Sequence, residues 1–282
     1  MKNEVKEHST TARGLKTAWL QYGSSEKPIL LMLHGYPDSP ECYRHQTQYF
    51  KKDFQVVIPY VRGCGPSESS KKLDRFRLDA LATDTLEVLL NVDPKSKRKV
   101  YLMAHDLGVP LAWHLMPLLG SRLGKIVVIN GLSLRQMARR WKFLSQHRKS
   151  WYIYLMQVPG LLENLFRFAP VSLKRWMLRL GGRVDSVTTS RHAKNTLVNP
   201  SKQYRAFMLD MLGLGKYYPA ENCPCPLLVL WGAKDPFLNM PTRDEILMDA
   251  KQLTIRMLEG SHWMHLNKPD IVNKLVLDHF AV

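Results

Sequence analysis

Short runs of apolar residues recur along this chain, and segments with apolar residues three and four positions apart separate most of them. The runs predict strands at residues 14–23, 28–33, 54–59, 125–130, 226–231 and 253–258, with a further strand beginning at 99. The segments between them predict helices at 41–50, 78–90, 107–119 and 268–280. This alternation predicts an α/β fold with a mostly parallel central sheet and helices on both faces.

Residues 132–220 break the alternation. They are rich in Trp, Tyr, Arg and Leu, and their short helical patterns are interrupted by proline and glycine. We interpret them as a helical cap inserted after the strand at 125–130, over the carboxyl edge of the sheet. The predicted domains are an α/β core of residues 1–131 and 221–282 and a helical cap, or lid, of residues 132–220.

Composition narrows the class of protein. A chain of 282 residues that is 45% hydrophobic can bury a sizeable core. Its four cysteines favour a reducing compartment over a disulfide framework. The first six residues form a largely polar segment with no apolar run, and no apolar run elsewhere approaches membrane-spanning length, so we expect a soluble, cytoplasmic protein.

The formal net charge of +17 is concentrated in the predicted cap. Residues 133–220 hold sixteen Lys and Arg against three acidic residues. No nucleic-acid-binding motif accompanies this charge, so we expect no nucleic-acid partner. Two interpretations remain: a solvated basic surface, which we rank first, and peripheral contact with an anionic membrane. The oligomeric state is not indicated.

The junction at residues 99–109 carries the first candidate for chemistry. Ala104 and Gly108 are small enough for a sharp strand-to-helix turn, which would expose Asp106 between them at the carboxyl end of the strand. An aspartate at such a nucleophile elbow can attack a carbon electrophile and form an ester. Alternatively, Asp106 only caps the helix, because Asp is favoured at that position.

Two later residues complete a constellation. Asp235 follows the strand at 226–231, and His262 follows the strand at 253–258. The order nucleophile, acid, histidine is typical of this architecture. It predicts that His262 is the base and that Asp235 orients it and stabilises its charged form.

An oxyanion hole is predicted at the early segment His34-Gly35-Tyr36-Pro37, which follows the strand at 28–33. In this architecture, the backbone N–H groups of Tyr36 and Leu107 would point together at a site above Asp106. A plain turn explains the glycine and proline equally well. The position of the segment after that strand favours the functional interpretation.

Over nearly its whole length, the chain resembles the epoxide hydrolase branch of the α/β-hydrolase fold. The matching motifs are His34-Gly35-Tyr36-Pro37, Arg62-Gly63-Cys64-Gly65-Pro66-Ser67, His105-Asp106-Leu107-Gly108, Asp235 and Gly260-Ser261-His262-Trp263. Two cap segments resemble the tyrosine motifs of this family and imply catalytic phenols at Tyr152, with Tyr154 as the alternative, and at Tyr204. The resemblance also implies substrate-binding positions at His34, Pro37, His105 and Trp263.

The resemblance implies a reaction that needs no metal or organic cofactor. Asp106 would open an apolar epoxide while the two phenols hold its oxygen. Water activated by His262 and Asp235 would then hydrolyse the ester to a vicinal diol. Leu107 departs from the Trp that often follows the nucleophile, which leaves the substrate range open. The alternatives are a haloalkane or haloacid dehalogenase with the same nucleophile, and a non-catalytic relative that binds a ligand or partner.

Overall fold

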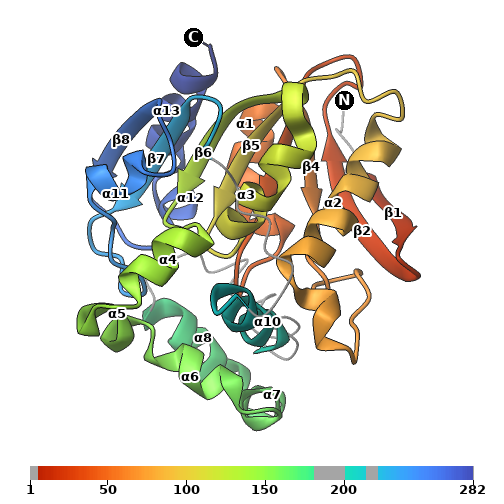
Figure 1. The fold of residues 1–282 in the computed structure, drawn as a ribbon. Helices are drawn as coiled ribbons and strands as arrows, with labels where there is room; N and C mark the ends of the chain where they lie inside the picture. The colour runs from red at the N-terminus through yellow and green to blue at the C-terminus, as the bar shows by residue number, and fades with distance from the viewer. Residues whose placement is uncertain (1–5, 181–200, 214–221, 282) are drawn as a thin grey trace.

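The computed structural model describes residues 6–180, 201–213 and 222–281 (Figure 1). Its strands form one sheet in the order β1-β2-β4-β3-β5-β6-β7-β8. In chain order they are β1 (Lys6–Ala12), β2 (Leu15–Tyr22), β3 (Ile29–Leu33), β4 (Gln55–Pro59), β5 (Val100–His105), β6 (Leu123–Ile129), β7 (Leu227–Gly232) and β8 (Leu253–Leu258). β2 pairs antiparallel with β1 and β4, and the other neighbours pair parallel. The predicted α/β fold class is therefore confirmed.

The sequence pattern missed one strand. β1 has the sequence KEHSTTA, in which only the final alanine is both apolar and buried. The strand lies at the edge of the sheet, where its side chains stay largely in water, so no apolar run marks it. Backbone pairing with β2 over seven residues holds β1 in the sheet.

The side chains of β3 alternate between two layers of the core. Ile29, Leu31 and Leu33 pack with residues of α2 (Leu78–Val92) and α3 (Gly108–Leu119) on one face of the sheet. Leu30 and Met32 pack on the other face with residues of α1 (Arg44–Phe50) and α13 (Pro269–Ala281). Because both faces are covered, every β3 residue is buried, which explains why this strand reads as one apolar run. Helices on both faces are as predicted.

Between β6 and β7 the described residues form helices that gather beneath the sheet in Figure 1. They are α4 (Leu134–Arg140), α5 (Leu144–Lys149), α6 (Trp151–Gln157), α7 (Leu161–Phe168), α8 (Val171–Leu180) and α10 (Ser201–Met211). The cap boundaries at 132 and 220 stay a prediction, and residues 181–200 and 214–221 of the predicted cap lie outside the described part. Two short helices, α11 (Arg243–Leu247) and α12 (Met264–Asn267), complete the core.

No helix in the described ranges is long and apolar enough to cross a membrane.

The junction between β5 and α3 is packed against the end of β3. A Cβ atom at Gly108 would lie 2.1 Å from the Leu33 carbonyl oxygen, a separation that atoms cannot adopt without a backbone shift. Glycine at this position therefore lets the first turn of α3 approach β3, and it fixes where the preceding residue projects.

We expect Gly108→Ala to lower the free energy of unfolding by about 3 kcal/mol, because backbone rather than a flexible side chain must move. Gly124→Ala is the matched control, since its new Cβ would meet only the Tyr101 ring, at 3.1 Å, and the ring can shift. Urea denaturation of both variants measures the difference. Equal losses in the two variants would contradict the proposed close packing at Gly108.

Candidate active site

Asp106 stands between β5 and α3 in a left-handed backbone conformation, with φ of +50°. The residue as a whole is 8% exposed. The residue in the N-cap position of α3 is Leu107, and the helix has no side-chain cap, so the capping role considered for Asp106 is not observed. Instead, its Oδ2 atom accepts a hydrogen bond of 2.9 Å from the Tyr36 backbone N–H. The carboxylate thus projects away from the helix, toward the loop that follows β3.

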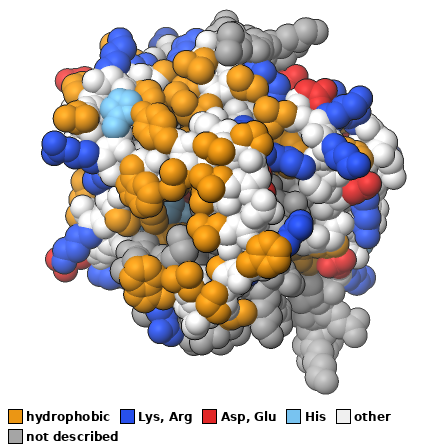
Figure 2. All heavy atoms as spheres, turned by 90° about the horizontal axis from the view of Figure 1, so that it is seen from below, with side chains coloured by type: hydrophobic (Ala, Val, Ile, Leu, Met, Phe, Trp, Pro, Cys, Tyr) orange, Lys and Arg blue, Asp and Glu red, His pale blue; other side chains and the backbone are white. Residues whose placement is uncertain are grey.

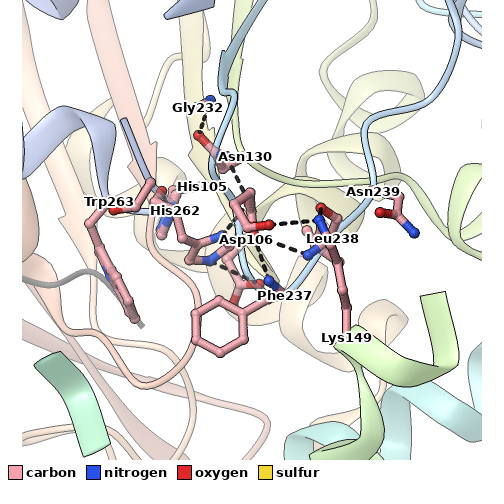
Figure 3. Close-up of polar contacts among 12 residues, drawn as sticks. His105, Asp106, Asn130, Lys149, Gly232, Phe237, Leu238, Asn239, His262 and Trp263 are labelled. Atoms are coloured by element: carbon pink, nitrogen blue, oxygen red, sulfur yellow. Dashed lines mark hydrogen bonds and ion pairs between the residues drawn. The ribbon is translucent and has the colours of Figure 1, made fainter. Parts of the chain in front are cut away.

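The structure brings together the three residues of the predicted triad, of which Asp106 and His262 are labelled in Figure 3. His262 Nδ1 lies 2.8 Å from Asp235 Oδ2, and His262 Nε2 lies 3.6 Å from Asp106 Oδ1. All three side chains are buried. Since Nδ1 faces the Asp235 carboxylate, Nε2 is the nitrogen directed toward Asp106.

Asp235 is held by donors that sequence reasoning did not find. Its Oδ1 accepts the backbone N–H groups of Phe237 and Leu238 at 2.8 and 3.0 Å. Its Oδ2 accepts the Asn130 side-chain N–H at 2.6 Å, and Asn130 Oδ1 in turn accepts the Gly232 N–H. Asn130 directly follows β6 with φ of +40°, a conformation that Asn tolerates better than most residues. Its position at a strand end was the available signal.

Three predicted substrate-binding residues are buried and do not line the cavity that contains Asp106. His105 is fully buried and bonds through Nε2 to the His262 carbonyl at 3.0 Å. Trp263 is buried and donates its indole N–H to Asp38 Oδ2 at 2.9 Å. Pro37 is buried after a cis peptide bond. His105 and Trp263 therefore support the backbone of His262, and Asp38 is a supporting residue that the sequence analysis missed.

His34 fixes the loop of the predicted oxyanion hole. Its Nδ1 lies 3.0 Å from the Gly35 carbonyl oxygen, and its Nε2 accepts the Val61 N–H at 3.3 Å. Burial lowers the pKa of His34, in agreement with a neutral ring that carries its proton on Nδ1. A Cβ atom at Gly35 would lie 2.5 Å from Asp106 Oδ2 and 2.7 Å from the Leu107 nitrogen, so this loop packs directly against the elbow.

A narrow cavity opens above Asp106. Its walls are largely apolar and include Leu107, Pro110, Leu132, Met137, Ile153, Phe207 and Leu238, together with the phenols Tyr152 and Tyr204. The two tyrosine rings pack edge to face, with their centroids 5.9 Å apart. Tyr154 is 46% exposed and bonds to His147, so it lies outside this group.

His262 has an unusual electrostatic environment. Burial alone would lower its pKa, but the Asp235 and Asp106 carboxylates outweigh burial and raise the pKa of His262 to about 10. For Asp235, burial is likewise outweighed, and the nearby imidazolium and the N–H donors lower its pKa. The resting site is therefore an imidazolium between two carboxylates.

Among the described residues, one group could supply three metal ligands: Asp38, Cys42 and His265, all buried. It lies behind the triad, where Asp38 already accepts the Trp263 indole N–H. We therefore assign Asp38 a supporting role and predict no metal in the chemistry.

The sequence model of the alpha/beta hydrolase fold family matches residues 28–269, so the chain belongs to this family. Relatives narrow the assignment. Epoxide hydrolase 4 of Mus musculus is 28% identical over 284 residues, which cover 93% of this chain and 76% of the relative. Epoxide hydrolase 4 of Homo sapiens is also 28% identical, over 93% of this chain and 75% of its own. Within this family, the chain is thus similar to proteins of the epoxide hydrolase branch, in agreement with its motifs.

A solved structure agrees with the fold. The epoxide hydrolase of Bacillus megaterium, crystallised in complex with an inhibitor, superposes with a TM-score of 0.83 at 21% identity. The match covers 98% of this chain and 100% of that one.

We expect the removal of either carboxylate to lower the pKa of His262 from about 10, because each one favours the charged ring. Asp235→Asn removes the strongest of these attractions, and Asp106→Ala removes the next. NMR titration of the imidazole measures both, with the exposed Asp278→Asn as control. An unchanged pKa of His262 in both variants would show that the ion pairs do not form.

Proposed function

We propose that this protein hydrolyses apolar epoxides to vicinal diols through a covalent ester on Asp106. The observation that carries the proposal is the pair of phenols, Tyr152 and Tyr204, in the same small cavity as the Asp106 carboxylate. A carboxylate below and two O–H donors above match the needs of an epoxide, in which carbon is attacked as negative charge develops on oxygen. The relatives named as epoxide hydrolases support the same reaction.

In the first step, an Asp106 oxygen attacks an epoxide carbon and the bond from that carbon to the ring oxygen breaks. We assign the attack to Oδ1, because Oδ2 is already held by the Tyr36 N–H. Tyr152 or Tyr204 donates a proton to the alkoxide as it forms. Burial raises the pKa of both phenols, so each stays protonated in the resting site and is available as a donor.

Ester formation changes the charge beside His262. Once Asp106 is esterified, one of the two carboxylates that hold the imidazolium is neutral, so the pKa of His262 falls. The ring can then release its proton, which restores the phenol that donated to the alkoxide. His262 becomes a neutral base only after the nucleophile has reacted.

In the second step, neutral His262 takes a proton from water, and the resulting hydroxide attacks the ester carbonyl carbon. Negative charge develops on Oδ2, which the Tyr36 N–H already contacts at 2.9 Å, and the Leu107 N–H is the second predicted donor. In the collapse of this intermediate, the bond from the carbonyl carbon to the substrate oxygen breaks, and that oxygen takes the proton that remained on the attacking hydroxyl. The diol leaves, the Asp106 carboxylate is restored, and His262 is already an imidazolium. The overall balance is epoxide plus water to diol.

The alternatives fit less well. A dehalogenase needs N–H donors, such as indoles, for the departing halide, and Leu107 offers no side-chain donor beside the nucleophile. None of the described residues that line the cavity carries an indole. A non-catalytic binding protein would have no need of a histidine placed between two carboxylates, hydrogen-bonded to Asp235 and within ion-pair distance of Asp106.

We expect His262→Gln to form the Asp106 ester but to hydrolyse it very slowly. Intact-mass spectrometry after addition of styrene oxide should show protein heavier by one substrate molecule. Asp106→Ala is the control and should gain no mass. Full turnover by His262→Gln with no adduct would remove His262 from the mechanism.

We expect Tyr152→Phe and Tyr204→Phe each to slow ester formation on the order of 100-fold, because each removes one donor to the developing alkoxide. Single-turnover kinetics with an epoxide measures this step. Tyr154→Phe is the matched control from the same helix and should react at the wild-type rate, since its phenol faces outward. Wild-type rates in a Tyr152→Phe/Tyr204→Phe double variant, or efficient turnover of haloalkanes instead, would refute the epoxide assignment.

A further inference from the structure

Two cap helices display apolar residues to solvent at helical spacing. In α6 and the residue that follows it, Trp151, Leu155 and Val158 are exposed. In α7, Leu161, Leu165 and Phe168 are exposed, and the Phe168 side chain is 80% accessible. Both sets follow the spacing i, i+4, i+7, so each forms one stripe along its helix. We call these six residues the apolar cap face.

Other residues of the same two helices already pack into an apolar cluster within the cap. Ile153 and Met156 of α6 and Leu162 of α7 are buried in a cluster around Tyr204, and they already anchor the two helices. The helices are therefore apolar on their outer side in addition to their packed side. Apolar stripes that stay exposed on helices already anchored by other, buried residues favour contact with a second apolar environment, such as a partner or a membrane.

Basic residues predominate in the segment that carries the apolar cap face. Residues 133–180 hold ten Lys and Arg and a single acidic residue, Glu163. That carboxylate is engaged by Arg205 and Ser201. Lys142, Arg148 and Arg167 are exposed, and Figure 2 shows hydrophobic side chains gathered on this side of the molecule with Lys and Arg side chains around them.

We propose that the apolar cap face binds the surface of an anionic lipid bilayer, with its apolar side chains in the headgroup region and the surrounding cations on lipid phosphates and carboxylates. Apolar residues with a basic border are the composition that favours such interfacial binding. A second copy of this chain is a poorer occupant, because it would bring the same positive charge against the face.

The apolar cap face and the proposed catalytic cavity share helix α6. Within α6, Trp151 points outward while its neighbour Tyr152 lines the cavity. Apolar substrates partition into lipid, so a bilayer against α6 would bring them beside the cavity. The docking itself does not depend on the proposed reaction.

Sedimentation with phosphatidylcholine vesicles, with and without phosphatidylserine, tests the proposal. We expect binding that requires phosphatidylserine and weakens as salt is added. Leu165→Ser/Phe168→Ser should lower the partition constant at least tenfold, and Arg148→Gln and Arg167→Gln about fivefold each. The matched control is Leu118→Ser/Ile271→Ser. It removes two exposed apolar residues from the surface of the α/β domain, outside the cap, and should bind like wild type.

Thermal unfolding of each variant, which is independent of any activity, verifies that the fold is intact. The proposal is overturned if the wild-type protein does not bind vesicles that contain phosphatidylserine. It is also overturned if Leu118→Ser/Ile271→Ser loses as much binding as Leu165→Ser/Phe168→Ser. A dimer in sedimentation equilibrium that Leu165→Ser/Phe168→Ser dissociates would assign the face to a second copy, and this also overturns the proposal.

Discussion

The close packing of three chain segments around Asp106 is the constraint on which the site depends. The residue has a left-handed backbone conformation, which costs about 1–3 kcal/mol for a non-glycine residue. This conformation of Asp106 persists because three segments pack against the elbow. They are β3, the loop after β3 and the loop after β6. Gly35, Gly108 and Gly131 each lie where a Cβ atom would collide with this junction or with the strand end beside it. The sheet supplies the rigidity, and the glycines allow the approach.

Besides the position of Asp106, the site depends on how its buried charges are compensated. Two carboxylates and one imidazole are buried within a few ångströms, and isolated buried charges are costly. The cost is offset because Asp235 accepts three N–H groups besides facing His262. The imidazolium then balances one of the two negative charges. This arrangement explains why the imidazole of His262 favours its charged form despite its burial.

Positions that directly follow a strand could be predicted from the sequence. Asp106, Asp235 and His262 come after β5, β7 and β8, and parallel strands bring their carboxyl ends to one edge. Side-chain direction could not be predicted in the same way. His105 and Trp263 flank the triad residues in sequence, yet they face the core behind His262, because adjacent positions project differently around a turn. The supporting roles of Asn130 and Asp38 depend on tertiary contacts across more than a hundred residues, which no local pattern encodes.

The cap shows why a pattern can be correct and still incomplete. Apolar residues at nearly every position of α6 predict a buried helix, but burial in this chain accounts for only one side of it. Ile153 and Met156 pack inside, Tyr152 borders the cavity, and Trp151 and Leu155 face outward. A helix with these three surroundings links the phenol that would polarise the substrate to a surface that would meet lipid. Selection on either surface constrains the other, because a rotation of α6 that buried its outer stripe would withdraw Tyr152 from Asp106.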